Sequence, residues 1–175
     1  MKKYISLFVL VVLFISLCGC NYSEEYIDIK NYKEIWDMSE IRVVEESKLF
    51  PKSVDNLDVE KFYGKQTVYF PIGTGYELLL TVKYNKSDFE KELERIKATG
   101  NGSVTKNSFS YDCYATVWNI NGVFEYAIIG KDTIDYVYLQ LISQGEETVD
   151  KKYLPLNYDI EIGKAKFSCY DYIEE

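Results

Sequence analysis

The chain has 175 residues, with 28 acidic and 20 basic side chains and a formal net charge of −8. Nucleic-acid phosphates repel so acidic a chain, and we expect no nucleic-acid partner. Histidine is absent, which excludes a histidine-based catalytic triad, an ordinary zinc site and a switch of unperturbed pKa between about 5 and 8.

The first residues have the layout of a secretory signal. Lys2 and Lys3 give a positive start, and the run from Tyr4 to Leu17 is apolar except for two serines. At about 14 residues, the run is shorter than the roughly 20 that a membrane-spanning helix needs. It predicts a cleaved signal, and the alternatives are an uncleaved anchor helix or ordinary secretion.

Residues 17–20, Leu-Cys-Gly-Cys, resemble the lipobox of bacterial lipoproteins. The resemblance implies that residues 1–19 are a lipoprotein signal peptide and that Cys20 receives diacylglycerol and becomes the new N-terminus. Cys18 departs from the usual pattern, in which Ala, Ser or Thr is commoner at that position. The implied location is the extracytoplasmic face of a bacterial cell membrane, with the bilayer as partner through the lipid anchor.

The remaining chain predicts one domain. Removing residues 1–19 deletes two lysines and lowers the net charge from −8 to −10. Residues 20–30 are expected to form the lipidated cysteine and a short tether, and the ten residues 21–30 span at most about 35 Å when extended. Residues 31–175 are enough for a single core, and we expect a single α+β domain there.

Residues 66–84 read as a β-hairpin, since strand-forming runs flank a Gly/Pro turn. A helix is predicted over 87–98, because Ser87 and Glu90 have capping-box spacing. Its apolar stripe consists of Phe89, Leu93 and Ile96. We expect this stripe to pack on one face of a mostly antiparallel sheet.

Residues 110–142 predict a three-stranded antiparallel meander. Asn121-Gly122 is the preferred pair for a two-residue type I′ turn, which sets the register of the first two strands. The expected pairs are Val117 with Tyr126, Ala115 with Ile128, and Asn119 with Phe124. These two strands and the turn between them complete the first half of the meander.

The second turn, near Lys131-Asp132, decides which side chains of strand 133–142 face the core. A connection of two or four residues places on one face the apolar set Cys113, Ala115, Val117, Tyr126, Ile128, Val137 and Leu139. A three-residue connection would reverse the third strand and bury Tyr136, Tyr138 and Gln140 instead. We expect the first arrangement.

The opposite face of the meander is the candidate site. It carries Tyr114, Thr116, Trp118, Glu125, Tyr136 and Tyr138. Aromatic rings beside a carboxylate can stack on sugars or anchor a protein, so Tyr114, Trp118, Glu125, Tyr136 and Tyr138 form a candidate ligand-binding face for an envelope protein or glycan. The alternative is structural: these are ordinary strand residues, and the N-terminal segment or the tail covers them as a second layer.

Two cysteines remain after processing. Residues 163–173 predict a C-terminal strand with Ala165, Phe167 and Cys169 facing inward, and Cys113 has the same inward phase. A Cys113–Cys169 disulfide would stabilise the fold by about 4 kcal/mol. The alternative is two buried thiols in strands that are not neighbours.

Catalytic motifs are absent from the sequence. It contains no G-x-S-x-G elbow, H-E-x-x-H, P-loop or EF-hand loop, and we expect no catalytic residues, metal or cofactor. The predicted function is a non-catalytic binding or interaction role in the envelope. The alternatives are a hydrolase that uses a carboxylate pair and a structural or protective surface lipoprotein.

Overall fold

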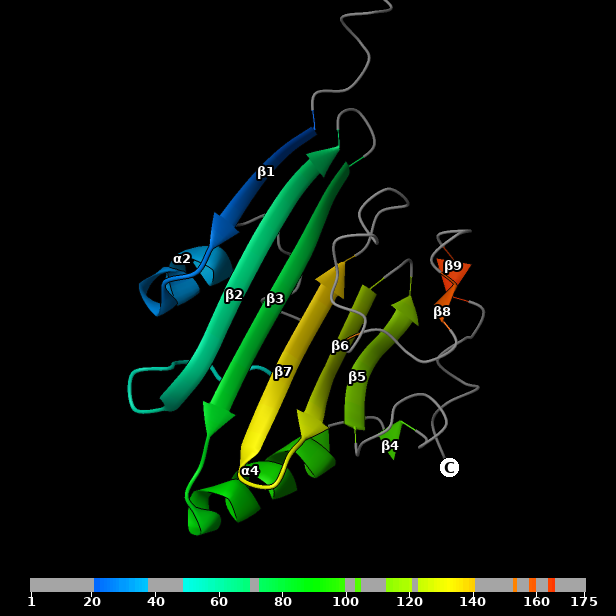
Figure 1. Cartoon of the computed structure of the whole chain (residues 1–175). Helices are drawn as coiled ribbons and strands as arrows, with labels where there is room; N and C mark the ends of the chain where they lie inside the picture. Colours follow the sequence, from blue (N-terminus) through cyan, green and yellow to red (C-terminus); the bar gives the residue numbers. More distant parts are fainter. Residues whose placement is uncertain are drawn as a thin grey trace, which may run out of the picture.

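The computed structural model describes residues 21–37, 49–69, 73–99, 103–104, 113–120, 123–140, 153, 158–159 and 164–165 (Figure 1). The strands are β1 (Asn21–Tyr26), β2 (Asp58–Tyr69), β3 (Gly73–Lys83), β4 (Ser103–Val104), β5 (Cys113–Ile120), β6 (Val123–Ile129), β7 (Thr133–Gln140), β8 (Tyr158–Asp159) and β9 (Lys164–Ala165). The helices are η1 (Ile29–Asn31), α2 (Tyr32–Asp37) and α4 (Lys86–Thr99). Within these ranges the fold is α+β and mostly antiparallel: β1-β2-β3-β7-β6-β5-β4 form one sheet, and β8 pairs with β9.

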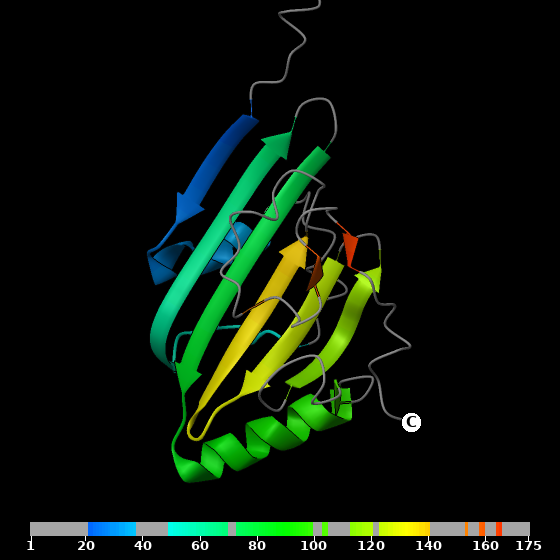
Figure 2. The same cartoon turned by 45° about the vertical axis from the view of Figure 1, so that its right-hand side comes forward.

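The predicted hairpin is confirmed as β2 and β3, although β2 begins at Asp58, eight residues before the predicted start. Its register is unbroken from Tyr69 opposite Gly73 to Lys61 opposite Thr81, and then it shifts. The predicted helix is also confirmed, with one extra residue at each end. In two views, α4 runs across one end of the sheet (Figures 1 and 2).

The helix cap differs from the prediction. The backbone N–H of Asp88 donates to the side-chain Oδ1 of Asn85 at 3.1 Å, and the N–H of Phe89 donates to the Asn85 carbonyl at 2.9 Å. Asn85 is therefore the N-cap, and the predicted capping box at Ser87 is wrong. Asparagine is as good an N-cap as serine, and the observed cap lies two residues before the predicted one.

The second turn of the meander has one of the two predicted lengths. Ile129 pairs with Ile134 across four connecting residues, and within this connection the Gly130 N–H donates to the Thr133 carbonyl at 2.9 Å. Val137 therefore shares a face with Tyr126, its register partner. The three-residue alternative is wrong.

The predicted register between β5 and β6 is wrong beyond the turn. Ile120 pairs with Val123, as a two-residue turn requires, but two irregularities follow, between Trp118 and Ile120 and between Ala115 and Val117. The observed pairs are Trp118 with Phe124, Val117 with Glu125, Ala115 with Tyr126, and Cys113 with Ile128. Because side chains alternate along a strand, the two shifts together keep Ala115 and Cys113 on the predicted core face. Val117 moves to the register position of the opposite face.

The predicted tether belongs to the domain. Residues 21–26 form β1, which pairs along β2 from Asn21 opposite Tyr69 to Tyr26 opposite Gly64. Tyr26 is buried, and Asp28 caps η1 by accepting the Lys30 N–H at 3.0 Å. The prediction of a short tether over residues 20–30 is therefore wrong for the described part, residues 21–30.

The C-terminal strand is described only over β9. This strand pairs with β8, so at Lys164 and Ala165 the predicted C-terminal strand does not join the main antiparallel sheet. Phe167 and Cys169 lie outside the described residues.

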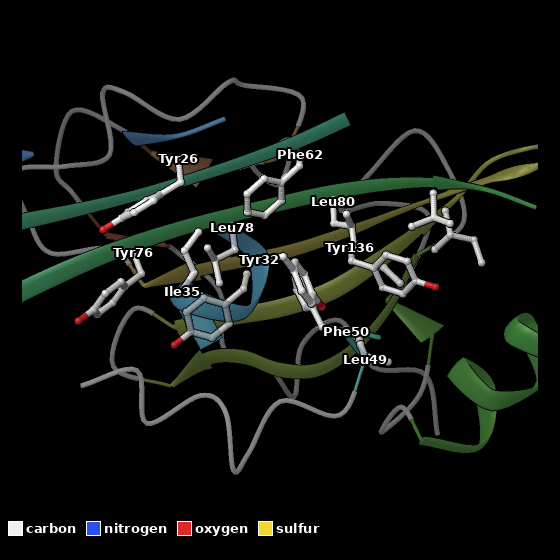
Figure 3. Close-up of a cluster of buried hydrophobic side chains, with 14 of the residues drawn as sticks. Tyr26, Tyr32, Ile35, Leu49, Phe50, Phe62, Tyr76, Leu78, Leu80 and Tyr136 are labelled. Carbon is white, nitrogen blue, oxygen red and sulfur yellow. The ribbon is translucent and has the colours of Figure 1, made fainter. Parts of the chain in front are cut away.

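One face of the main sheet holds most of the described core. We call it the tyrosine face and define it by Phe62, Tyr76, Leu78, Leu80, Val82, Glu125, Ala127, Ile134, Tyr136 and Tyr138, which the register brings to one side. Its cover consists of α2 and residues 49–57 (Figure 3). A Cβ at Gly64 would lie 2.6 Å from Cδ1 of Ile35, so the missing side chain at Gly64 lets α2 come close to β2.

Candidate functional site

The predicted ligand-binding face is not an open surface. Tyr136 and Glu125 are 0% exposed, Tyr138 is 3% exposed, and Tyr114 is half-buried. The backbone of Trp118 lies opposite Phe124, so its register position belongs to the other face from Glu125. The structure brings Glu125, Tyr136 and Tyr138 together inside the core, and the prediction that they form an accessible binding face is wrong.

The structural alternative for this face is confirmed, because the N-terminal part of the chain covers it. The ring of Phe50 lies 5.8 Å from the ring of Tyr136, centroid to centroid, and the ring of Tyr32 on α2 meets Phe62 edge-on at 5.9 Å. The Tyr32 hydroxyl donates to the Pro51 carbonyl at 2.5 Å, which ties the two covering segments together. Figure 3 shows the four rings on the same side of the sheet, where those of the cover meet those of the strands.

Glu125 is the one carboxylate of the predicted site, and it is fully buried. Its Oε1 accepts the backbone N–H of Leu49 at 3.2 Å, and Leu49 is itself fully buried. A carboxylate in this position satisfies a buried backbone donor of the cover, as buried polar groups must. It is engaged in holding the covering segment and does not face solvent.

A chain of polar side chains lies where β7 meets α4. The hydroxyls of Tyr84 and Tyr136 are 2.7 Å apart, and Tyr136 donates to Oε1 of Glu92 at 2.6 Å. Arg95 donates to the same carboxylate through Nη2 at 2.6 Å and Nε at 2.8 Å. Its Nη2 also donates to the Leu49 carbonyl at 2.5 Å. This network therefore joins the sheet, the helix and the cover.

The environment of the network raises the pKa values of its two tyrosines. Burial, followed by the neighbouring Tyr84 and Glu92, raises the pKa of Tyr136 far above its usual range. Burial raises the pKa of Tyr84 to about 12, although its hydrogen bond to Tyr136 acts in the opposite direction. Both hydroxyls stay protonated at neutral pH and act as hydrogen-bond donors, which is a structural role and supplies no nucleophile.

Sequence reasoning missed this network. The available signal was the spacing of Glu92 and Arg95, which stand three residues apart and so meet on one side of a helix. No local pattern pointed to Tyr136 as their partner, since 44 positions separate it from Glu92.

Cys113 is buried and forms no disulfide with another residue that the structure describes. Burial raises the pKa of this thiol well above its usual range, and a protonated thiol is a poor nucleophile and a poor metal ligand. Its predicted disulfide partner, Cys169, lies outside the described residues. The Cys113–Cys169 disulfide therefore stays a prediction.

Neither a metal-binding cluster nor a membrane-spanning helix occurs among the described residues. No cluster of three or more His, Cys, Asp or Glu side chains suited to a metal ion occurs among them. Within the same ranges, no helix is both long enough and apolar enough to cross a bilayer. No family model matches the chain, and neither a curated protein nor a solved structure matches it.

Proposed function

We propose that this protein is a lipid-anchored extracytoplasmic domain with a non-catalytic interaction role. The observation that carries the proposal is the order of the first 20 residues: a positive start, an apolar run to Leu17, and then Gly19-Cys20. Each part has the place that a lipoprotein signal requires. Asn21, the first described residue, already lies in β1, so the folded domain reaches the residue next to the proposed acylation site.

The membrane partner follows from the lipid itself. Each buried CH₂ contributes about 0.8 kcal/mol, and a single acyl chain binds only marginally. The diacylglyceryl group proposed for Cys20 carries two chains. Its binding would therefore be stable without any apolar surface on the domain.

The non-catalytic role is supported by the contacts of two carboxylates, one fully buried on β6 and one half-buried on α4. Glu125 accepts a backbone N–H of the cover, and Glu92 is held by Arg95 and Tyr136. A hydrolase with two carboxylates needs both to face a substrate. These contacts favour an interaction or structural role, and an envelope protein or glycan would bind elsewhere than on the tyrosine face.

We also infer that α4 closes one end of the tyrosine face. Ile96 is fully buried and belongs to the same core cluster as Leu80 and Tyr136. Phe89 packs against that cluster from the same helix. Together with the bond from Tyr136 to Glu92, these contacts support packing of the helix against this end.

The anchoring proposal is tested with Cys20→Ala in the full chain, and Cys18→Ala is the matched control. Acyl labelling and membrane fractionation should show that Cys20→Ala is unlabelled and either unprocessed or released. Cys18→Ala should remain labelled and membrane-bound, because Cys18 lies in the part removed. Normal labelling and cleavage of Cys20→Ala would overturn the proposal.

The non-catalytic role is tested by incubating the full chain with cell-wall glycans and assaying the release of new reducing ends. We expect none. Hydrolysis that is lost in a folded Glu92→Gln or Glu125→Gln variant would replace the proposal with the hydrolase alternative.

A further inference from the structure

We infer that one end of the main sheet rests at the bilayer surface, and that the end carrying α4 points away from the membrane. The membrane-facing end is marked by Asn21 and Tyr69, which are register partners, and by Gly73 opposite Tyr69. The start of β1 and the start of β3 lie together at this end, opposite α4, in both views (Figures 1 and 2). The inference rests on the proposed acylation of Cys20.

The orientation follows because almost no flexible chain separates the anchor from the sheet. Asn21 is already paired with Tyr69, so a single peptide unit separates Cys20 from the sheet. Consecutive Cα atoms are about 3.8 Å apart. A free tether of ten residues would have allowed up to about 35 Å, and β1 removes that freedom.

The length of the sheet then sets the position of the far end. β3 runs from Gly73 to Lys83, and at about 3.3 Å per residue it spans roughly 33 Å. Since α4 begins at Lys86, an upright sheet presents this helix roughly 33 Å from the anchor. A partner in the envelope would meet this end first.

Charge on the edge strand favours the upright orientation. Glu24 and Glu25 on β1 are both exposed, and they stand four and five residues after Cys20. If β1 lay flat, both carboxylates would approach an anionic lipid surface within the screening length of about 8 Å. In the upright sheet they lie roughly 13–17 Å away, beyond that length.

The side chain of Tyr22 is suited to the membrane–water interface. It is 61% exposed and stands two residues after Cys20. Tyrosine is enriched at membrane–water interfaces, because its ring and hydroxyl suit the headgroup region. Tyr22 should therefore lie among the lipid headgroups.

The test places the photo-reactive residue p-benzoylphenylalanine at position 22 or, as the matched control, at position 131 in the full chain in native membranes. Lys131 is also exposed and lies in the connection between β6 and β7, at the α4 end. Irradiation should give several-fold more lipid adduct at position 22. An insertion of about 12 Gly/Ser residues after Cys20 should lower that adduct several-fold, because it restores a flexible tether.

Acyl labelling of the same samples separates the two ways of failing. Normal labelling with equal adducts at both positions, or with more at position 131, overturns the orientation alone. Loss of labelling overturns the proposed anchor and the orientation together.

Discussion

The two faces of β7 are equally buried but are built from different side chains. Val137 and Leu139 on the predicted core face are 0% and 1% exposed, whereas Tyr136 and Tyr138 on the tyrosine face are 0% and 3% exposed. The aliphatic pair needs only apolar neighbours. The tyrosines also need partners for their hydroxyls, and Tyr138 donates to Gln140 at 3.1 Å. A tyrosine-rich face can therefore be core, provided that its polar tips are bonded.

The largest effect should come from emptying the tyrosine face. We expect Tyr136→Ala to lower the free energy of unfolding by about 3–5 kcal/mol, because it leaves a large cavity and removes a hydrogen-bond donor from Glu92. Urea unfolding measures the loss. A loss below about 1 kcal/mol would mean that this face is a surface.

A slightly smaller loss is expected on the other face. Leu139→Ala should lower the free energy of unfolding by about 2–5 kcal/mol through the cavity alone. The same urea experiment compares the two variants directly. A negligible loss for Leu139→Ala, with a large one for Tyr136→Ala, would show that only the tyrosine face is core.

The helix that supplies Glu92 provides a sharper and smaller test. Asn85→Ala should cost about 1 kcal/mol, because it removes the side-chain acceptor at the start of α4. Ser87→Ala is the matched control and should change stability by no more than about 0.5 kcal/mol. The reverse order in thermal unfolding would restore Ser87 as the cap.

The last prediction concerns stability that is lost only at alkaline pH, so its effect at neutral pH is the smallest. It is also the prediction most specific to the tyrosine face. The pKa of Tyr84 is raised to about 12 and that of Tyr136 is raised further, while unfolded tyrosine titrates near 10. The folded state therefore binds protons more tightly, so this stability is complete below pH of about 10 and is lost as the pH rises through the folded values.

The measurement is the fall in melting temperature between pH of about 9 and about 11. Tyr136→Phe should show a smaller fall than the parent, because it removes one of the perturbed hydroxyls. Leu139→Met, a volume-conserving change on the other face, should show the parent's fall. Identical falls in all three chains would contradict the assignment of the raised pKa to Tyr136.

Local sequence signals predicted strands and a helix of the fold. For part of the sheet they also predicted which side chains are buried. The Gly/Pro turn predicted the β2–β3 hairpin, and the length of the Lys131-Asp132 connection placed Val137 and Leu139 on a buried face. These features depend on residues only a few positions apart. The two shifts in β5 could not be read this way, because irregularities of a ladder carry no distinct residue pattern here.

The prediction of an open binding face was wrong for a related reason. Whether the tyrosine face is open depends on contacts distant in sequence, such as the bond between Leu49 and Glu125, which are 76 positions apart. Alternation along β7 shows that two faces differ, and it cannot show that a second layer covers one of them. The pairing of β1 with β2 is hidden in the same way, since it joins Tyr22 to Val68.

The place of β7 beside β3 has a consequence for folding kinetics. The β2–β3 and β6–β7 hairpins are local in sequence. The seam between them, which is the pairing of β3 with β7, joins Leu78 to Tyr138 across 60 positions. The hydroxyl of Thr81 also donates a hydrogen bond of 2.6 Å to Asp135 across this seam. Closing so long a loop loses chain entropy before the seam's contacts form. The two hairpins should therefore form early and the seam should close late. In refolding experiments, Thr81→Val should then speed unfolding and leave the folding rate almost unchanged.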